Sequence, residues 1–494
     1  MVFPPFSRLQ IVRACVLAAA ALVSGSAFAL SFTSFDARSL GLGGAGVANA
    51  RPDEAMYFNP ALLSVDPAGS DHRLSVSLDV GARLVDRDGF IHGVRHYQDH
   101  DADKVFAAAL ADFNDRVAQQ TLSLEDFDRL DSASNNLFDD IEGLSNRPLR
   151  VGAAIGISVA RPGRTGIAGF TRRYAIGGGV VNFAAEDRAS ISSAIDFGRS
   201  TFELTSLFDD YVQFLRDNAA SLESSYADGG FGALEQNLRG LLAQSELADN
   251  TEGLVSILRS YHDAYLAGAT DIQGIESFSR LPGFDQNLKT SIELQGAVIT
   301  EYGVSFSRRL GTARGLSIGA SIKGVQFDTF DYEGLVNTAE SEAFSYRDHR
   351  RPYSDLNVDV GMTATLKRNL HWGLTARNLI ARRYRTVRGN VIELKPVVRA
   401  GIAWQRERLT VAADLDLTRN EPLGFDADRR FLAVGVERRW ARWSLRGGVR
   451  HNLVDGVQLY SLGTAVRLGR AEIALSAAVA KDTIASALRF AFEF

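Results

Sequence analysis

Apolar and polar residues alternate along much of the chain with a period of two. The last eleven residues are the clearest case, because their side chains divide into a mostly apolar set and a small or charged set. The first set is Ile484, Ser486, Leu488, Phe490, Phe492 and Phe494, and the second is Ala485, Ala487, Arg489, Ala491 and Glu493. Successive side chains of a strand point to opposite faces. The segment therefore predicts a β-strand with one apolar face.

The same alternation predicts fourteen strands. Their ranges are 72–85, 149–160, 166–186, 291–308, 315–327, 354–367, 371–379, 395–406, 408–418, 430–440, 443–451, 457–468, 471–480 and 484–494. Short turns alternate with long connections, and the long ones are 87–148, 187–290, 328–353 and 380–394. An even strand number with short turns on one side is typical of single-chain bacterial outer-membrane barrels. The fold prediction is an all-β transmembrane barrel of about 14 antiparallel strands, spanning residues 72–494.

Hydropathy and composition agree with a barrel. The mean hydropathy is −0.06, and no segment after residue 29 has the roughly 18 consecutive apolar residues that a membrane helix needs. The mean hydropathy of a barrel is close to zero because each strand presents one polar and one apolar face.

The first 29 residues predict a cleaved signal peptide. Arg8 and Arg13 precede an apolar stretch at 14–23, and a small-x-small cleavage site ends at Ala29. The only cysteine, Cys15, lies inside this peptide, so the mature chain is expected to form no disulfide and no thiolate metal site.

Loss of the two arginines of the signal peptide lowers the formal charge from −5 to −7, which disfavours nucleic-acid binding through a basic surface. The expected location is the outer membrane of a Gram-negative bacterium.

Two long connections carry helical patterns instead of strand patterns, at about 103–145 and 203–267. Leu234, Leu238 and Leu241 show the spacing of an amphipathic helix. We expect external helical insertions. Their apolar stripes have two interpretations, the core of a helical cap or a groove that binds a partner.

Residues 39–63 stand apart from the strands and suggest a plug, or hatch, that extends over 30–71. Gly43, Gly44 and Gly46 permit close approach of backbone to backbone. Asn59 and Pro60 then impose an extended or turned backbone before Ala61. A compact, partly apolar, glycine-rich segment with a hard turn suits a plug packed inside a barrel.

These two motifs, LGLGGAGVANA and DEAMYFNPALL, resemble the N-terminal hatch of outer-membrane barrels of the fatty-acid transporter FadL and PorV type. Within that superfamily the chain is most similar to the conjugal transfer TraF-type outer-membrane proteins. The segments HWGLTARNLIARRY and FLAVGVERRWARWSLRGGVRHNL resemble barrel hairpins of the same superfamily. The mature chain has no cysteine, so no redox role is expected.

The resemblance implies two classes of function. The first is a FadL-like barrel that passes hydrophobic or amphipathic small molecules through a lumen gated by Gly43, Gly44, Gly46, Asn59, Pro60 and Ala61. The second is a structural or docking barrel in an envelope-spanning conjugation or secretion apparatus. The expected partners are the lipid bilayer, a hydrophobic ligand or proteins of such an apparatus, and the barrel assembly machinery. The terminal phenylalanines Phe490, Phe492 and Phe494 resemble the signal that this machinery recognises.

Charged residues of both signs occupy the predicted lumen face. They include Asp79, Arg83, Asp359, Arg377, Arg399, Asp414, Glu437 and Arg446. Charges that project inward must be solvated or paired. They could form a network that fills the lumen and seats the hatch, or a path whose arginines attract an anionic headgroup.

Other chemistry has little support in the sequence. His92, His96 and His100 recur every four residues, which on a helix could place two imidazoles beside a carboxylate as zinc ligands; a solvated histidine-rich loop is the alternative. Motifs for nucleophilic, zinc-protease or dinucleotide chemistry do not occur. We expect no enzyme activity and no cofactor.

Overall fold

The computed structural model describes residues 35–65, 74–119, 121–206, 208–266, 289–310, 315–335, 346–367, 369–420 and 428–494. The predicted signal peptide at 1–29 and the ends of the predicted hatch, 30–34 and 66–71, lie outside these residues. Two compact units are present. The barrel unit combines residues up to His96 with Leu144–Phe183 and Thr290–Phe494, and the helical unit combines Tyr97–Gly143 with Ala184–Lys289.

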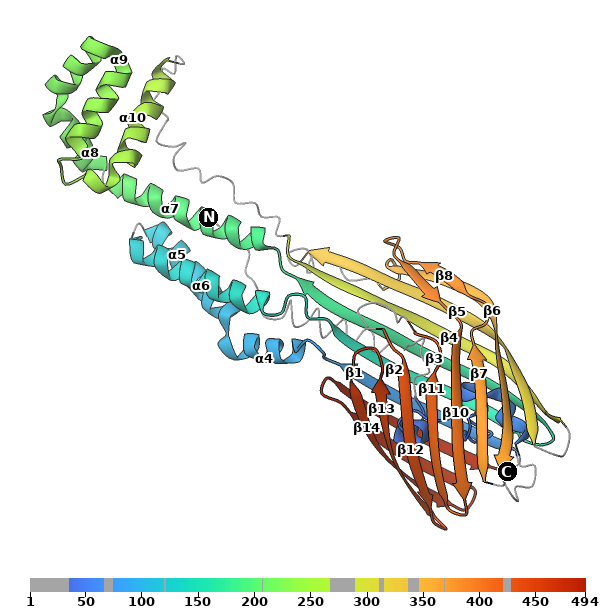
Figure 1. Ribbon diagram of the computed structural model, residues 1–494. Helices are drawn as coiled ribbons and strands as arrows, with labels where there is room; N and C mark the ends of the chain where they lie inside the picture. The colour runs from blue at the N-terminus through green and yellow to red at the C-terminus, as the bar shows by residue number, and fades with distance from the viewer. Residues whose placement is uncertain are drawn as a thin grey trace. The chain divides into compact units, whose positions relative to one another are not determined.

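Fourteen antiparallel strands form a closed barrel, which confirms the predicted fold class (Figure 1). The strands are β1 (Ser75–Val85), β2 (Leu149–Arg161), β3 (Thr165–Asn182), β4 (Ser291–Leu310), β5 (Leu316–Leu335), β6 (Arg350–Lys367), β7 (Leu370–Arg377), β10 (Val397–Arg406), β11 (Leu409–Asp416), β12 (Phe431–Arg439), β13 (Trp443–Asn452), β14 (Gln458–Leu468), β15 (Ala471–Val479) and β16 (Thr483–Glu493). β1 pairs with both β2 and β16, so the first and last strands close the sheet.

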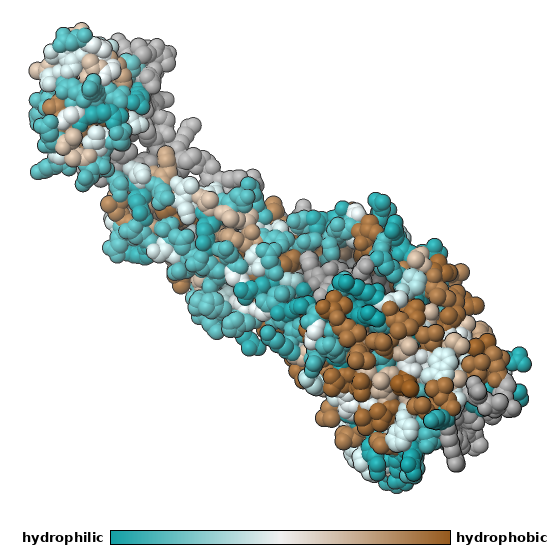
Figure 2. Space-filling model, viewed as in Figure 1, coloured by the Kyte–Doolittle hydropathy of each residue, from teal (hydrophilic) through white to brown (hydrophobic). Residues whose placement is uncertain are grey.

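The two faces of the wall follow the predicted alternation. In β16, Phe490 and Phe492 are 44% and 41% exposed on the outer surface, whereas Arg489 is fully buried on the inner side. Apolar side chains also cover much of the barrel surface in Figure 2. An aliphatic and aromatic outer face with a polar interior is the arrangement that a lipid bilayer requires.

The two ends of the barrel differ in the length of their connections. Short turns at 407–408 and 469–470 lie at one end, which we call the short-turn end. The connections at 86–148 and 183–290 leave the opposite, long-connection end. The predicted connection at 328–353 is shorter than expected, because β5 runs on to Leu335 and β6 begins at Arg350. The third strand ends at Asn182, four residues before the predicted end.

The predicted connection at 380–394 contains a second small sheet. β8 (Arg382–Arg385) and β9 (Val391–Leu394) form an antiparallel hairpin. Tyr384 is buried, and its ring stacks on that of Phe327 from the barrel wall at a centroid distance of 4.0 Å. Apolar residues of this hairpin belong to the same buried cluster as Tyr57 and Leu62 of the hatch. The hairpin therefore helps to fill the lumen.

The hatch consists of three short helical turns: α2 (Ala37–Gly41), α3 (Ala55–Phe58) and the 3₁₀ helix η1 (Pro60–Ser64). The Asp36 carboxylate caps α2 by accepting a hydrogen bond of 2.8 Å from the Ser39 amide. Asn59 caps η1 in the same manner through the Ala61 amide, and Pro60 takes the first helical position, where its missing donor is not needed.

Helices fill the two longest connections. Between β1 and β2 lie α4 (Phe90–His100), α5 (Ala102–Gln119) and α6 (Leu124–Glu142), and α7 (Ala185–Ser206) follows β3. The rings of Phe113 and Phe127 meet edge to face at 5.0 Å where α5 packs on α6. The first helix of each connection, α4 and α7, begins earlier than the predicted limits of 103 and 203. None of the helices in the described ranges is both long and apolar enough to cross a membrane.

The remaining helices have a hydrophobic core of their own. They are α8 (Phe208–Asp217), α9 (Ala219–Leu242), η2 (Ala248–Asn250) and α10 (Thr251–Leu266). Leu222, Leu238 and Leu254 are buried between them. The Tyr211 hydroxyl donates a hydrogen bond of 3.0 Å to the Leu254 carbonyl and so ties α8 to α10.

Truncation of this core is expected to unfold α8–α10 without affecting the barrel. Leu238 is completely buried, so Leu238→Ala should cost about 2–5 kcal/mol of the stability of this helical group. Limited proteolysis should cleave the variant faster within 208–266, while the electrophoretic migration of the folded barrel stays unchanged. Tyr226→Ala on the exposed face of α9 is the matched control, and the protease should cleave it at the same rate as the wild type. Loss of the folded barrel in Leu238→Ala would contradict the independence of this core.

Candidate functional site

The hatch approaches the barrel wall most closely at a ring of wall glycines. A Cβ atom added at any of these positions would come within 3.3 Å of a hatch atom. The ring comprises Gly81, Gly156, Gly166, Gly319, Gly361, Gly373, Gly401, Gly435, Gly448 and Gly463. At Gly81, for example, the added atom would lie only 2.5 Å from the Phe35 carbonyl oxygen. The wall thus leaves room for the hatch backbone almost all the way round the lumen.

The hatch glycines complete this close fit. Gly43 has a φ of +68°, and a Cβ there would lie 2.7 Å from the Val449 carbonyl oxygen of β13. Gly44 also has a positive φ, +99°. A Cβ at Gly46 would meet the Phe58 ring within the hatch at 2.5 Å. Only glycine satisfies both the backbone conformation and the space at Gly43, since other residues rarely adopt positive φ.

Asn59 joins two parts of the hatch to the wall. Its amide nitrogen donates to the Val47 carbonyl at 3.0 Å and to the Met362 carbonyl of β6 at 3.1 Å. Next to it, the Ser307 hydroxyl of β4 donates to the Ala61 carbonyl at 3.0 Å. The segment 59–64 contains no charged residue, so its attachment to β4–β7 rests on hydrogen bonds and packing.

Ion pairs hold the other side of the hatch. Arg489 of β16 is fully buried and lies 3.1 Å from Glu54 of the hatch and 3.0 Å from Asp79 of β1, and it also pairs with Asp53. Arg51 pairs with Glu472 of β15 at 2.5 Å. Such buried pairs are costly to break because each remaining charge would be left in a low-dielectric interior.

Glu54 also belongs to a second cluster of ion pairs. Arg38 on α2 contacts Glu437 of β12 at 2.9 Å and Glu54 at 3.2 Å. Glu437 in turn accepts a hydrogen bond of 2.9 Å from Arg446 of β13. Ion pairs therefore anchor the hatch to β12, β15 and β16. Along β4–β7 the hatch is held by packing and by hydrogen bonds, two of which arginines of the wall donate to hatch carbonyls.

This environment changes the titration of hatch residues. Burial, together with the negative charge of Glu54, raises the pKa of Asp36. Burial alone would lower the pKa of Arg51, but the carboxylates of Glu472 and Glu437 outweigh it and raise the pKa. Arg51 thus remains a cation in the lumen, while Asp36 gains a proton more readily than an exposed aspartate.

The structure places the eight predicted lumen residues in two locations. Seven are buried beside the hatch or in ion pairs close to it: Asp79, Asp359, Arg377, Arg399, Asp414, Glu437 and Arg446. Among these, Asp414 accepts the Gly46 and Val47 amides at 2.8 and 3.0 Å. Arg83 is apart from this group and lines a pocket near the long-connection end of the barrel.

Several residues of the network were not singled out in the sequence. The hatch charges Arg38, Arg51, Asp53 and Glu54 are the most important of them. Together with Asp36 they make five charges within a largely apolar, glycine-rich segment. This is a usable signal, because a buried hatch must pair its charges. Lys323, which is buried and pairs with Glu301 and Asp359, lies outside the predicted set as well.

An apolar hollow of about 640 Å³ lies on the lipid-facing side of the wall. Outward side chains of β4, β5, β6, β7 and β10 line it, among them Phe306, Ile318 and Met362. Its floor includes Gly319 and Gly361, whose inner sides face Asn59, Pro60 and Ala61 of the hatch. At these two glycines no wall side chain lies between the hollow and the uncharged part of the hatch.

The histidines predicted as metal ligands lie on α4, so the helical spacing is present. His96 and His100 are one turn apart, and the His100 Nδ1 atom lies 3.1 Å from the Asp140 carboxylate of α6. Asp140 replaces the neighbouring aspartates that the sequence suggested, and His92 lies outside the described group of His96, His100 and Asp140. Metal binding here stays a prediction.

A closed fourteen-stranded barrel with an apolar outer surface and a lumen filled by its own N-terminal segment defines a plugged transmembrane barrel. The family model described as "F plasmid transfer operon, TraF, protein" matches residues 56–416. The chain belongs to this family.

Several solved structures are similar to this chain. They include the Ralstonia pickettii toluene transporter TbuX (12% identity, 94% of this chain and 99% of that chain, TM-score 0.45) and the P. putida toluene transporter TodX (11%, 94% and 99%, 0.44). A Pseudomonas aeruginosa FadL homologue is 9% identical over 95% of this chain and 99% of that chain, with a TM-score of 0.43. No curated protein matches the sequence.

Proposed function

We propose that this protein lies in the outer membrane and passes hydrophobic or amphipathic small molecules through a lumen gated by its hatch. The observation that carries the proposal is the apolar hollow on the lipid-facing side opposite Asn59, Pro60 and Ala61. Its volume is in the range of small-molecule sites, which are about 300–1,000 Å³. An apolar molecule that leaves the lumen at this point enters the bilayer without crossing a polar layer.

The uneven anchoring of the hatch supports a gate at this position. Residues 36–54 are held by ion pairs to β12, β15 and β16, whereas Asn59, Pro60 and Ala61 are held by neutral contacts. Displacing the neutral segment breaks hydrogen bonds worth about 1 kcal/mol each, far less than exposing a buried charge. Gly43, Gly44 and Gly46 lie in the anchored part, where they set the fit of the hatch to the wall.

The proposal is tested by uptake of an uncharged aromatic probe. Cells that express the protein should take up N-phenyl-1-naphthylamine faster than cells without it. Ala320→Trp places an indole in the hollow from β5 and should return the rate to that of cells without the protein. Ala477→Trp on the lipid-facing side of β15 is the matched control and should retain the native rate.

Equal rates in the Ala320→Trp and Ala477→Trp variants would rule out passage through the hollow. Equal rates with and without the protein would rule out transport of this class of molecule. Both variants must show the folded-barrel band before rates are compared, so that failure to assemble is not mistaken for a blocked route.

A second candidate is a docking barrel in an envelope-spanning conjugation or secretion apparatus. The separate hydrophobic core of α8–α10 favours it, because transport through the lumen needs no such domain. The family description refers to a plasmid transfer operon and is consistent with this role. Removal of residues 203–267 should abolish co-purification with envelope proteins if docking is the function, and should leave probe uptake intact if transport is.

A further inference from the structure

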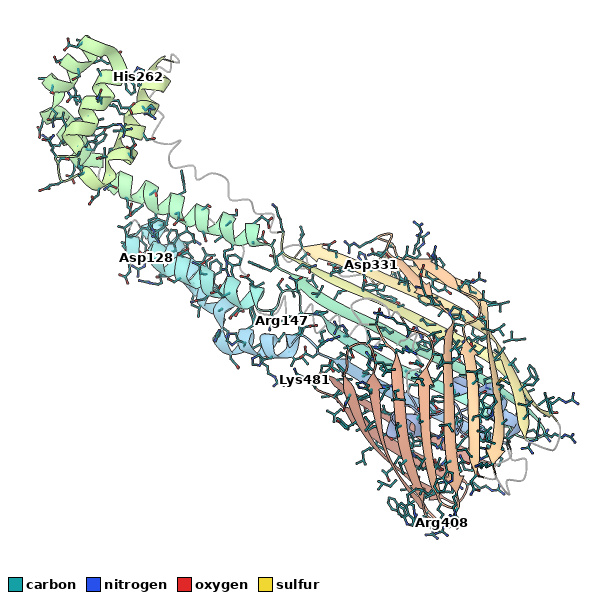
Figure 3. All side chains as sticks on the ribbon, viewed as in Figure 1. Asp128, Arg147, His262, Asp331, Arg408 and Lys481 are labelled. Carbon is teal, nitrogen blue, oxygen red and sulfur yellow. The ribbon has the colours of Figure 1, made fainter. Side chains whose placement is uncertain are left out.

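The outward-facing rows of β10 and β12 both end in an arginine at the short-turn end of the barrel. On β10 the outward residue Trp404 is followed two positions later by Arg406, and on β12 Val436 is followed by Arg438. Both arginines are exposed. Figure 3 labels Arg408, in the turn after Arg406, at this end of the barrel. Two residues of a strand span about 7 Å, so both arginines lie just beyond the apolar surface that faces lipid.

Strand pairing places these two arginines at the same height on the wall. Leu409 of β11 is the register partner of Arg406 on one side and of Arg438 on the other. Two strand spacings, about 10 Å, therefore separate their backbones. Their long side chains flank Leu409, so both guanidinium groups can converge on one ligand in front of β11.

Neither arginine is neutralised by the protein. Within the ranges that the structure describes, the guanidinium groups of Arg406 and Arg438 make no ion pair and no hydrogen bond. The Arg438 guanidinium instead lies over the Trp440 ring, 5.9 Å from its centroid. A cation held by an aromatic face keeps its charge and its donors available to a further partner.

The acidic residues beside the pair do not supply the missing counter-charge. Glu437 faces the lumen, where it is engaged by Arg38 and Arg446. Glu407 is exposed in the turn next to Arg408, whose positive charge offsets it. Two positive charges therefore remain on this part of the outer surface.

We propose that Arg406 and Arg438 bind the phosphate group of an anionic phospholipid on the outer face of β10–β12. The apolar rows of these strands offer a surface to the acyl chains. Trp404 and Trp440 flank the arginines at the level where aromatic residues of barrels meet lipid headgroups. Guanidinium groups present pairs of donors that match phosphate oxygens. A lipid with net negative charge is preferred, because a zwitterionic headgroup brings a cation of its own to the site.

The position of the two arginines favours a lipid over an acidic protein as the ligand. A protein that approaches from the aqueous side meets turn residues such as Arg408 first, whereas Arg406 and Arg438 continue rows that the bilayer covers. The inference rests on the membrane location that is part of the proposed function, but it does not depend on transport through the lumen.

The intrinsic fluorescence of the protein reports on this site. The four tryptophans of the chain lie on or directly beside β7, β10, β12 and β13, near the short-turn end: Trp372, Trp404, Trp440 and Trp443. The full-length protein is reconstituted in phosphatidylcholine bilayers that contain either dibrominated phosphatidylglycerol or dibrominated phosphatidylcholine at equal mole fraction. Bromine quenches only tryptophans that the lipid touches, so the two titrations give the relative affinity for the anionic lipid.

The wild type should prefer phosphatidylglycerol by about fivefold, the contribution of one arginine at an anionic lipid surface. The double variant Arg406→Gln with Arg438→Gln should bind the two lipids equally. Arg406→Lys with Arg438→Lys keeps both charges and should retain a preference. The matched control removes two exposed arginines of α4 and α8, by Arg95→Gln with Arg216→Gln, and should behave as the wild type does.

Equal quenching by the two lipids in the wild type would overturn the proposal. A preference that survives in the double glutamine variant, or that is lost in the control as well, would also overturn it. If neither lipid quenches the fluorescence, the membrane location fails together with the site. Loss of aromatic probe uptake with an intact lipid preference would instead contradict the transport proposal alone.

Discussion

Arg489→Gln is expected to destabilise the plugged barrel by about 3–5 kcal/mol, the usual cost of removing one partner from a buried ion pair. Arg489 is completely buried and faces Asp53, Glu54 and Asp79. Without it, these three carboxylates remain together in the lumen and repel one another. Water must enter to solvate them, so we expect the hatch to lose its attachment to β1 and β16.

The measurement is the temperature at which the folded band converts to the unfolded one during electrophoresis of unboiled samples. Arg489→Gln should convert at a clearly lower temperature and should conduct ions in planar bilayers, because water replaces the displaced hatch. Arg467→Gln is the control, since Arg467 on β14 is exposed and its pair with Glu472 is screened by solvent. A variant with native conversion temperature and native conductance would mean that this ion-pair cluster does not hold the hatch.

Gly361→Val is expected to displace residues 59–64, the uncharged part of the hatch, from their position against the wall. The side chain at this position would occupy the space of the Asn59 carboxamide, which makes three hydrogen bonds to Val47, Ala61 and Met362. Loss of three neutral hydrogen bonds costs about 3 kcal/mol, before the steric clash is counted. We expect a folded barrel with a displaced 59–64 segment and a higher rate of aromatic probe uptake.

Gly169→Val is the matched control for this experiment. Gly169 lies on β3, faces outward and has no atom within 4 Å of an added Cβ, so valine there should change neither uptake nor stability. If both glycine variants behave as the wild type does, the close fit between wall and hatch has no bearing on the gate.

The barrel could be predicted because its determinants are local. In β16 the outer position of Phe490 and the inner position of Arg489 follow from the strand period alone. Turns such as 469–470 are short enough to fix the pairing of their neighbours. The strand ends next to the long connections were predicted less accurately. β5 and β6 extend beyond the segment in which apolar and polar residues alternate, so the pattern does not show where they end.

The β8–β9 hairpin and the partners of the hatch charges were missed for a different reason. Tyr384 is buried by contact with Phe327, which is 57 residues away in the chain. The alternation of apolar and polar residues within a strand cannot predict a contact between such distant residues. Arg489 and Asp53 are likewise brought together only when the barrel closes around the hatch. The sequence predicted that lumen charges need partners, but pairing across the lumen depends on the tertiary fold.

Residues 35–65 fold back into the lumen of their own barrel. Ser64 of η1 and Ser307 of β4 touch through their hydroxyl groups, so Ser64→Cys and Ser307→Cys place two thiols at bonding distance. The only natural cysteine, Cys15, lies in the predicted signal peptide and does not interfere.

The measurement is disulfide formation between these two cysteines in isolated outer membranes, read by peptide mapping with and without reductant. We expect a disulfide that links the hatch to β4. No disulfide should form when Ser64→Cys is combined with Ser476→Cys on β15, because Ser476 contacts a different part of the hatch, at Ala37. Absence of the first link in a folded barrel, or equal formation of both, would contradict a hatch seated as described.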